Sequence, residues 1–378
     1  MCGIAGIWQI DGQKAPDWRR AFIAGFSGTL QDETAYASLA AERAGAIPVV
    51  RQFSGEGFRA HVDAYLYQFE EIGGLFGAAS WVLYGEMRRQ GVVISLDGHG
   101  GDELLGGYDL HIMLALLRSG GLMAARGRTL DLIDTLRHMY RAGQPERPAS
   151  TAVLAAMTVP GVRAVAQHLP IVGRRQRMLA EDLRRHSPDP TLATDEAARI
   201  EEQAIERLGP LTAVLYRSFH RYSLPRILRN FDVHSMGHGV EVRMPLLDWR
   251  LVCYGFSVPD ESKVSGGYAK LLLREAMRGV LPEPVRLRRD KLGYNAPVAH
   301  WLGHGLENWL WDELNDPEFL RSELWDAPAL LKLASAKRRF RAPWRPAEAR
   351  RVTLAVTAHW WLTRWLRRAI SPSGQRPH

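Results

Sequence analysis

The sequence predicts an α/β protein, with a partial doubly wound parallel sheet followed by a large helical C-terminal part. Between residues 26 and 110, short apolar runs with strand character alternate with longer stretches whose apolar residues recur at helical spacing. Strands that alternate with helices in this way form parallel sheets. After Tyr108 the pattern is helical to about Ile370, and we expect no strands there.

The α/β part alternates strand and helix along the chain. In order, we expect a strand at 26–30, a helix at 33–44, a strand at 47–53, helices near 58–69 and 76–90, and a strand at 92–96. The last strand begins with Val92-Val93-Ile94, an apolar and β-branched run that is typical of a strand buried on both faces.

A loop rich in glycine and acid follows this last strand directly. Its residues are Asp97, Gly98, His99, Gly100, Gly101, Asp102 and Glu103. Glycine lets backbone N–H groups approach a ligand closely, and open α/β sheets bind ligands at the carboxyl ends of their strands. An acid in a phosphate site holds magnesium, which neutralises the charge of a polyphosphate. The alternative is a tight surface turn with solvated acids.

The composition is that of a globular protein without membrane segments. The chain has 378 residues, 46% of them hydrophobic and 24% charged, which allows one large domain or two. Two cysteines, Cys2 and Cys253, cannot form a disulfide framework, so we expect a reducing, cytoplasmic environment. No apolar run approaches the ~20 residues of a membrane span.

The formal net charge is +8, and two basic clusters supply much of it, at Arg174–Arg177 and Lys337–Arg341. Such clusters can bind nucleic acid. Solvated helix faces are the more common origin of such runs, so we do not expect nucleic acid as a partner. Attraction of anionic substrates is a third interpretation.

The acidic loop continues through Leu104-Leu105-Gly106-Gly107-Tyr108, and the whole string resembles the asparagine synthetases (glutamine-hydrolysing) and their relatives. In that family Gly-x-Asp-Glu-Leu-x-Gly-Gly-Tyr lines the ATP site. The resemblance implies an adenine-nucleotide α-hydrolase-like fold, contacts from Asp97 to Glu103 with ATP, and Asp102 as the Mg²⁺ ligand. His99 stands where synthetases that make asparagine often have an acid.

Two further stretches resemble the same family. The string from Asp232 to Asp248 matches its Val-Glu-x-Arg-x-Pro-x-Leu-Asp pattern, which makes Glu241 and Arg243 candidate catalytic residues. An extended backbone would place these two side chains on one side, so a structural salt bridge between them is the alternative. Lys291 begins a segment that looks like the family loop whose lysine approaches the phosphates. A solvated loop lysine is the alternative there.

The N-terminal string Met1-Cys2-Gly3-Ile4-Ala5-Gly6 looks like the opening of the family's glutaminase domain. The likeness covers about residues 1–8 and 26–365, and residues 13–25 are too few for a glutaminase fold. We therefore interpret 1–13 as a glutaminase remnant and Cys2 as its vestigial nucleophile. The family's Ser-Gly-Gly-x-Asp-Ser pyrophosphate loop has no counterpart, because Phe26-Ser27-Gly28-Thr29 lacks the second glycine and the aspartate.

The resemblance thus implies a synthetase-like domain at 26–370, with an α/β part to about 110, a helical part beyond, and a disordered tail at 371–378. It implies ATP-dependent amide formation through an acyl-adenylate, with Lys291 steadying transition-state charge. We expect a small carboxylate and an amine as substrates, aspartate and ammonia in particular, and a homodimer or partner chain as a further option. The alternatives are a nonfunctional remnant, a relative of lasso-peptide cyclases or β-lactam synthetases, and a nucleic-acid-binding protein.

Overall fold

A computed structural model describes residues 19–72, 74–118, 126–139, 203, 205–293 and 295–366. Three features of the sequence lie outside these residues: the segment 1–13 with Cys2, the cluster Arg174–Arg177, and the tail 371–378. None of the helices in the described part of the chain is long and apolar enough to cross a membrane.

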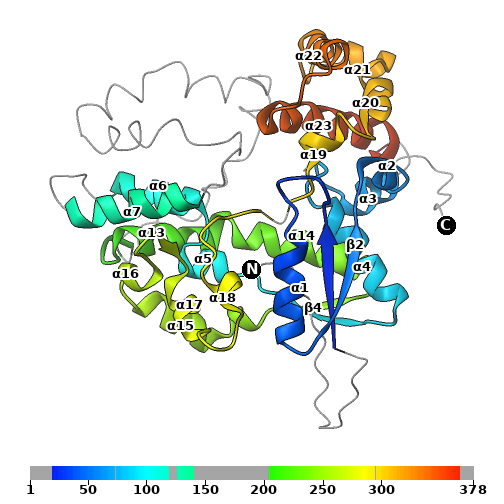
Figure 1. Cartoon of the computed structure of the whole chain (residues 1–378). Helices are drawn as coiled ribbons and strands as arrows, with labels where there is room; N and C mark the ends of the chain where they lie inside the picture. Colours follow the sequence, from blue (N-terminus) through cyan, green and yellow to red (C-terminus); the bar gives the residue numbers. More distant parts are fainter. Residues whose placement is uncertain are drawn as a thin grey trace.

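The N-terminal elements alternate strand and helix (Figure 1). They are β1 (Arg20–Gly25), α1 (Thr34–Arg43), β2 (Ile47–Gln52), α2 (Gly55–Arg59), α3 (Val62–Phe69), α4 (Ala78–Arg89), β3 (Ile94–Leu96), α5 (Gly101–Leu105), α6 (Asp109–Arg118) and α7 (Arg126–His138).

The second group of elements surrounds α5. It comprises α13 (Pro210–Arg217), the π-helical turn η1 (Ser218–Tyr222), α14 (Leu224–Met236), β4 (Glu241–Arg243), the 3-10 turn η2 (Pro245–Leu247), α15 (Trp249–Ser257), α16 (Asp260–Lys263), β5 (Val264–Ser265), β6 (Tyr268–Ala269), α17 (Leu271–Ala276) and α18 (Glu283–Arg286).

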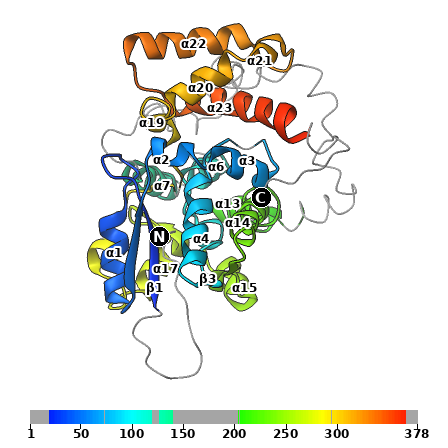
Figure 2. The same ribbon diagram turned by 90° about the vertical axis from the view of Figure 1, so that its right-hand side faces the viewer.

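A separate helical layer ends the described chain. Its elements are α19 (Val298–Trp301), α20 (Glu307–Leu314), α21 (Pro317–Arg321), α22 (Ala327–Phe340), α23 (Pro346–Trp360) and η3 (Trp361–Trp365). In both ribbon views this layer lies beyond α2 and α3, with α22 at the outer end of the molecule (Figures 1 and 2). Trp301, Leu310, Val352 and Trp360 join the layer to α3 in the largest hydrophobic cluster.

The strands confirm a mixed α/β protein with parallel pairing. β1 runs parallel to β2, with Arg20 opposite Ile47, and β3 runs parallel to β4, with Ile94 opposite Glu241. β5 and β6 form a short antiparallel pair. The strands of the described residues thus form three two-stranded sheets, so a single doubly wound sheet is not confirmed.

Helix α4 connects the two parallel pairs. Phe22 of β1 packs with Leu83 and Met87 of α4, and the same cluster includes Val92 before β3 and Val240 before β4. The opposite face of the β3–β4 pair is more exposed to solvent, since Val93, directly before β3, is 48% exposed. The expectation that Val92-Val93-Ile94 is buried on both faces was therefore wrong.

The predicted strand at 26–30 was also wrong. The strand lies earlier, at β1, where Ala21, Phe22 and Ile23 are almost completely buried. Residues 26–30 instead form a turn, in which the Thr29 hydroxyl donates to the carbonyl oxygen of Phe26 at 2.7 Å. Gly28 has φ +77° in this turn, which disfavours a strand.

The expectation of no strands after Tyr108 was wrong as well, because β4, β5 and β6 follow it. These strands have three, two and two residues. Segments this short contain too few residues for a periodic pattern to identify them. The helix predicted at 33–44 and the strand at 47–53 are confirmed by α1 and β2.

Candidate active site

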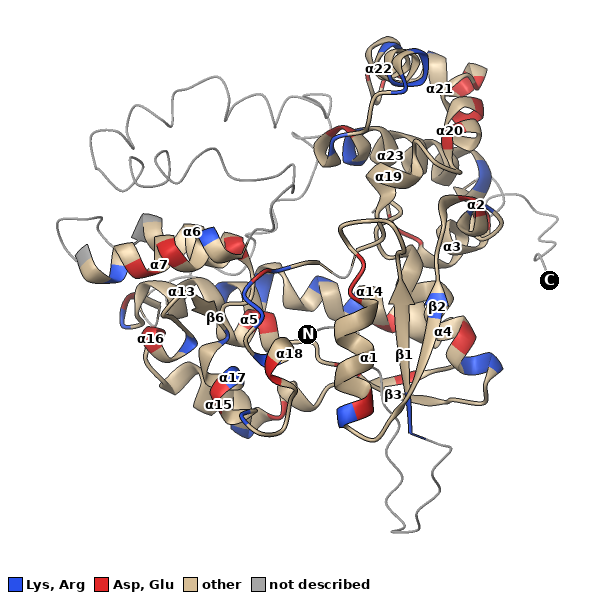
Figure 3. Cartoon of the chain, viewed as in Figure 1, with Lys and Arg blue, Asp and Glu red and all other residues tan. Residues whose placement is uncertain are grey.

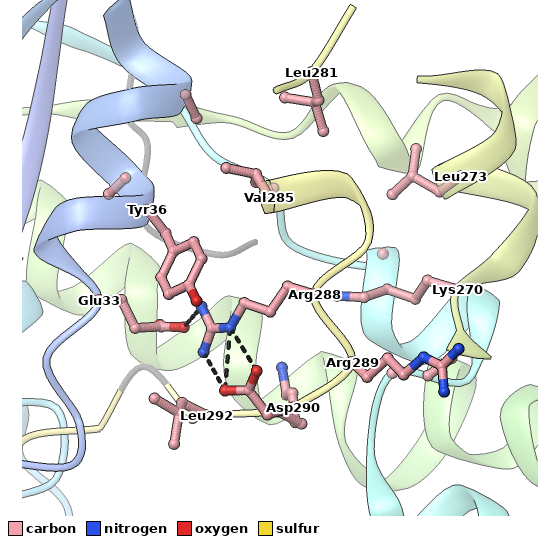
Figure 4. Close-up of a pocket in the computed structure, with 18 of the residues that line it drawn as sticks. Glu33, Tyr36, Lys270, Leu273, Leu281, Val285, Arg288, Arg289, Asp290 and Leu292 are labelled. Atoms are coloured by element: carbon pink, nitrogen blue, oxygen red, sulfur yellow. Dashed lines mark hydrogen bonds and ion pairs between the residues drawn. The ribbon is translucent and has the colours of Figure 1, made fainter. Parts of the chain in front are cut away.

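A cavity of about 340 Å³ opens at the carboxyl ends of β1 and β3 (Figure 4). Ile23 and Ala24 of β1 form one wall, and Gly98 and Gly101 of the loop after β3 form another. The segment 288–293 closes the opposite side. This volume lies within the range of small-molecule and cofactor sites, roughly 300–1,000 Å³.

One side of the cavity is apolar. The residues there come from α1, α17, the turn after α17, and α18, and they are Tyr36, Ala37, Ala40, Leu273, Met277, Leu281 and Val285. An apolar wall of this kind suits a flat aromatic ring, while the few polar groups at the other side fix its orientation.

The segment 288–291 supplies most of the charge in the cavity. Arg288 forms ion pairs with Glu33 at 2.5 Å and Asp290 at 3.0 Å, and its guanidinium lies 4.6 Å from the centre of the Tyr36 ring. The charge of Arg288 is therefore balanced within the protein, as Figure 4 shows. Arg289 instead stacks over the Tyr268 ring at 4.4 Å, without a carboxylate at ion-pair distance in the described part of the chain.

Asp102 is the centre of the charged side. It lies in the first turn of α5, is 3% exposed, and accepts from Lys270 Nζ at 2.7 Å and from Lys291 Nζ at 2.8 Å. Burial opposes the ionisation of Asp102, but the two ammonium groups outweigh it and hold the pKa of the carboxyl well below its usual value. The three side chains form a buried charge cluster beside the cavity.

Two glycines on either side of Asp102 leave space for neighbouring side chains. Gly100 has φ +88°, and a Cβ atom there would lie 2.1 Å from Leu247 Cδ2. A Cβ atom on Gly107 would lie 1.7 Å from Asp102 Oδ1. Glycine at 107 therefore leaves the space that the Asp102 carboxylate fills, and glycine at 100 allows both the positive φ and the close packing of Leu247.

Glu103 has a different environment although it is next in sequence. It is buried, and its Oε1 atom has no hydrogen-bond partner in the described structure. Burial raises the pKa of Glu103, against a hydrogen bond with Tyr108 that lowers it. The surroundings of Glu103 thus favour its neutral form, whereas those of Asp102 favour the charged form.

Asp97 and His99 point away from the cavity. The Asp97 carboxylate accepts from Tyr84 Oη at 2.5 Å and Ser95 Oγ at 2.6 Å, and His99 Nδ1 lies 3.7 Å from it. The His99 ring packs against Phe231 of α14, with the ring centres 4.0 Å apart. These two predicted site residues therefore contact α4 and α14, while Gly98 and Gly101 line the cavity itself.

Glu241 and Arg243 lie on one side of β4, as their spacing predicts. Arg243 Nε donates to Glu241 Oε1 at 2.8 Å, and both side chains are 56% exposed. They belong to the strand next to β3, where Asp97 N–H donates to the carbonyl oxygen of Arg243 at 2.9 Å. They do not line the cavity.

The cavity and the charge cluster bring together Asp102 and Lys291, which the sequence had singled out, with residues to which it had given no role. Lys270 is the most important of these, because it has φ +55° and its side chain reaches back to Asp102. Arg289 is the second. Both lie in the stretch 268–297 that resembles the family, where Lys270 begins a Lys-x-x-Leu-Arg-Glu string, but only the fold shows which groups they contact.

The model of one protein family, described as asparagine synthase, matches residues 5–367. The chain belongs to the asparagine synthase family. The resemblance of the acidic loop and of the two later stretches is thereby confirmed, and the chain is assigned to a ligase family.

Relatives in the family agree with this assignment. The chain is 27% identical to asparagine synthetase [glutamine-hydrolyzing] 1 of Bacillus subtilis (strain 168) over 222 residues, which are 59% of this chain and 33% of that protein. It is 25% identical to a putative asparagine synthetase [glutamine-hydrolyzing] of Mycobacterium bovis over 288 residues, or 75% of this chain and 42% of that protein. The chain thus spans less than half the length of these relatives.

Proposed function

We propose that the cavity binds ATP and that the chain uses it to form an amide bond. The observation that carries this proposal is the position of the Asp102 charge cluster beside an apolar-walled cavity at the carboxyl ends of two parallel strands. Ligands of open α/β sheets bind at that edge. Family membership supports the same chemistry.

In this proposal the adenine ring lies against the apolar side, near Tyr36 and Val285, and the phosphates face the charged side. Lys270, Arg289 and Lys291 supply positive charge there. Arg289 is suited to bind a phosphate group, because its guanidinium forms no ion pair with a carboxylate in the described part of the chain.

Asp102 also supplies one carboxylate of the kind that holds a magnesium ion. Mg²⁺ in nucleotide sites is held by one or two carboxylates together with phosphate oxygens and water, and it neutralises the polyphosphate charge. Asp102 is the carboxylate that would hold it, because its two oxygens lie beside the lysines that face the cavity. Each Asp102 oxygen accepts a hydrogen bond from a lysine ammonium group, so magnesium could bind only if Lys270 or Lys291 moved away from the carboxylate.

The proposed reaction has two steps. A carboxylate oxygen of the acceptor attacks the α-phosphorus of ATP, and the bond to the bridging oxygen breaks, so an acyl-adenylate forms and pyrophosphate leaves. Ammonia or another amine then attacks the acyl carbon and displaces AMP. Lys291 meets the charge that develops on the phosphate oxygens, a role in which a compact ammonium is effective.

We propose aspartate as the acceptor and ammonia as the amine. Glu241 and Arg243 are the first and last residues of β4, and the backbone of Arg243 contacts the loop after β3, so we assign this pair to the acceptor rather than to the nucleotide. Cys2 has no role in this reaction, because the stretch between Cys2 and β1 is too short for a domain that orients glutamine.

Calorimetry of ATP binding tests the assignment of the cavity. Arg289→Met should weaken binding about tenfold or more, because a charge-assisted contact with phosphate is worth roughly 1.5–3 kcal/mol. Arg51→Met is the matched control, since Arg51 is exposed on β2 outside the cavity. Equal affinities of both variants for ATP would place the nucleotide elsewhere, and no binding by the parent chain would favour a nonfunctional remnant.

A further inference from the structure

A strongly basic surface lies on the outer helical layer, far from the cavity. Residues 327–351 contain eight lysines and arginines and a single acid, Glu348, whereas the net charge of the entire chain is +8. This short segment therefore holds a net charge of +7. In Figure 3 the ribbon of α22, at the outer end of the molecule, carries the blue that marks lysine and arginine positions.

Seven of these residues are exposed, and together they define the basic surface. They are Lys332, Arg338, Arg339, Arg341, Arg345, Arg350 and Arg351. They come from α22, from the connection to α23, and from the first turns of α23.

The charge of the basic surface is not balanced by neighbouring acids. Glu348 is already engaged, because it forms an ion pair with Lys337 at 2.6 Å and accepts from the backbone N–H of Arg345 at 2.9 Å. Within the described part of the chain, the seven residues have no carboxylate at ion-pair distance. Glu348 acts on the charge of Arg345 alone among the seven, so most of their mutual repulsion is not offset, and a polyanion would relieve it.

Aromatic side chains lie among these arginines. Phe340, the last residue of α22, is 71% exposed, and the Arg339 guanidinium lies 5.4 Å from its ring centre. Arg338 stacks over Trp311 of α20 at 4.9 Å. An exposed phenylalanine beside stacked guanidinium groups offers flat surfaces of the kind on which nucleobases stack.

The apolar side of α22 is not available to a partner. Ala327, Leu330 and Ala334 are buried against the rest of the helical layer. A helix that binds in a membrane interface needs an exposed apolar face opposite its basic one, and α22 has used that face for packing. The basic surface therefore favours a soluble polyanion over a lipid bilayer.

We propose that the basic surface binds single-stranded nucleic acid. Six of its seven residues are arginines, whose planar fork binds phosphate oxygens in pairs, and Phe340 provides the stacking position. The sequence alone favoured a solvated helix face for the cluster at 337–341. The structure shows that Arg345, Arg350 and Arg351, which follow that cluster in the chain, are exposed as well, and that Lys337 of α22 and Glu348 of α23 form an ion pair that joins the two helices at this point.

The test is fluorescence anisotropy with a labelled 16-nucleotide RNA and the DNA of the same sequence, at several salt concentrations. A triple variant, Arg338→Gln/Arg339→Gln/Arg341→Gln, should reduce the slope of log K against log salt by about 2, because each phosphate contact contributes about 0.7 for a single strand. The matched control is Arg51→Gln/Arg88→Gln/Arg226→Gln, which removes the same charge from exposed positions elsewhere and should leave the slope nearly unchanged.

Phe340→Ala distinguishes stacking from simple attraction of charge. It should weaken nucleic acid binding about tenfold and leave the binding of a polyglutamate peptide unchanged. Three results would overturn the proposal: no binding of either oligonucleotide, equal slopes for the two triple variants, or tighter binding of the peptide or of phosphatidylserine vesicles than of the oligonucleotides. Because the basic surface is remote from the cavity, these results do not depend on ATP.

Discussion

Replacement of Asp102 by asparagine should destabilise the chain strongly. The substitution keeps the size of the side chain but removes the charge that Lys270 and Lys291 share. Lys270 is 6% exposed, so its ammonium would remain buried without a counter-charge. Breaking a buried ion pair by the loss of one partner costs about 3–5 kcal/mol.

For Asp102→Asn we expect the free energy of unfolding to fall by about 3 kcal/mol, the lower end of that range. Two features of the structure reduce it. The asparagine oxygen still accepts one hydrogen bond, and the Lys291 side chain, which is 20% exposed, can turn towards water. Glu103→Gln is the matched control in the same helix. It should cost less than about 1 kcal/mol, because the surroundings of Glu103 already favour a neutral group.

Urea unfolding followed by circular dichroism measures both variants. A double-mutant cycle with Lys270→Met isolates the contact, since that substitution should cost less in the Asp102→Asn background than in the parent chain. The reasoning about the charge cluster fails if Asp102→Asn and Glu103→Gln have the same effect. It also fails if the costs of Asp102→Asn and Lys270→Met simply add.

Three further predictions concern activity, pH and the N-terminus. Lys291→Met should slow adenylation about a hundredfold while changing ATP affinity much less, which pre-steady-state and binding measurements compare directly. His234 is buried beside Ser80 Oγ at 3.0 Å, and burial, together with Arg229 and His238, lowers its pKa to about 3. Because the folded chain keeps His234 neutral, this residue contributes its full stability above pH 6.5 and loses it as the pH falls towards 3. Between pH 7 and pH 5 the parent chain should therefore lose about 2 kcal/mol more stability than His234→Gln, as measured by urea unfolding at the two pH values. Cys2→Ala should leave ammonium-dependent activity unchanged, and glutamate release from glutamine that disappears in this variant would prove the assignment of Cys2 wrong.

The sequence predicted the elements that have a regular pattern or a distinctive motif. Helix α1 and strand β2 were found because their apolar residues recur at the right spacing. The acidic loop after β3 was found because glycine is required at Gly100 and Gly107, and this requirement leaves a signature in the sequence. The pairing of Glu241 with Arg243 followed from their spacing in an extended segment.

Other features had no local signal. Lys270 lies 168 residues from Asp102 in the sequence, and nothing near it indicates that its side chain reaches the acidic loop. The orientation of His99 is set by packing against Phe231 on α14, which the loop sequence does not encode. The strand at 26–30 was misplaced because Phe26 and Leu30 are apolar, although the turn at Gly28 separates them from β1.

The exchange of labelled pyrophosphate into ATP tests the proposed activity most directly. The proposal predicts exchange that requires both a carboxylate and magnesium, that is greatest with aspartate among the small carboxylates offered, and that falls about a hundredfold in Lys291→Met. Asp102→Asn should abolish the exchange that magnesium supports. Exchange without any carboxylate, or no exchange by a chain that binds ATP with normal affinity, would contradict the acyl-adenylate mechanism.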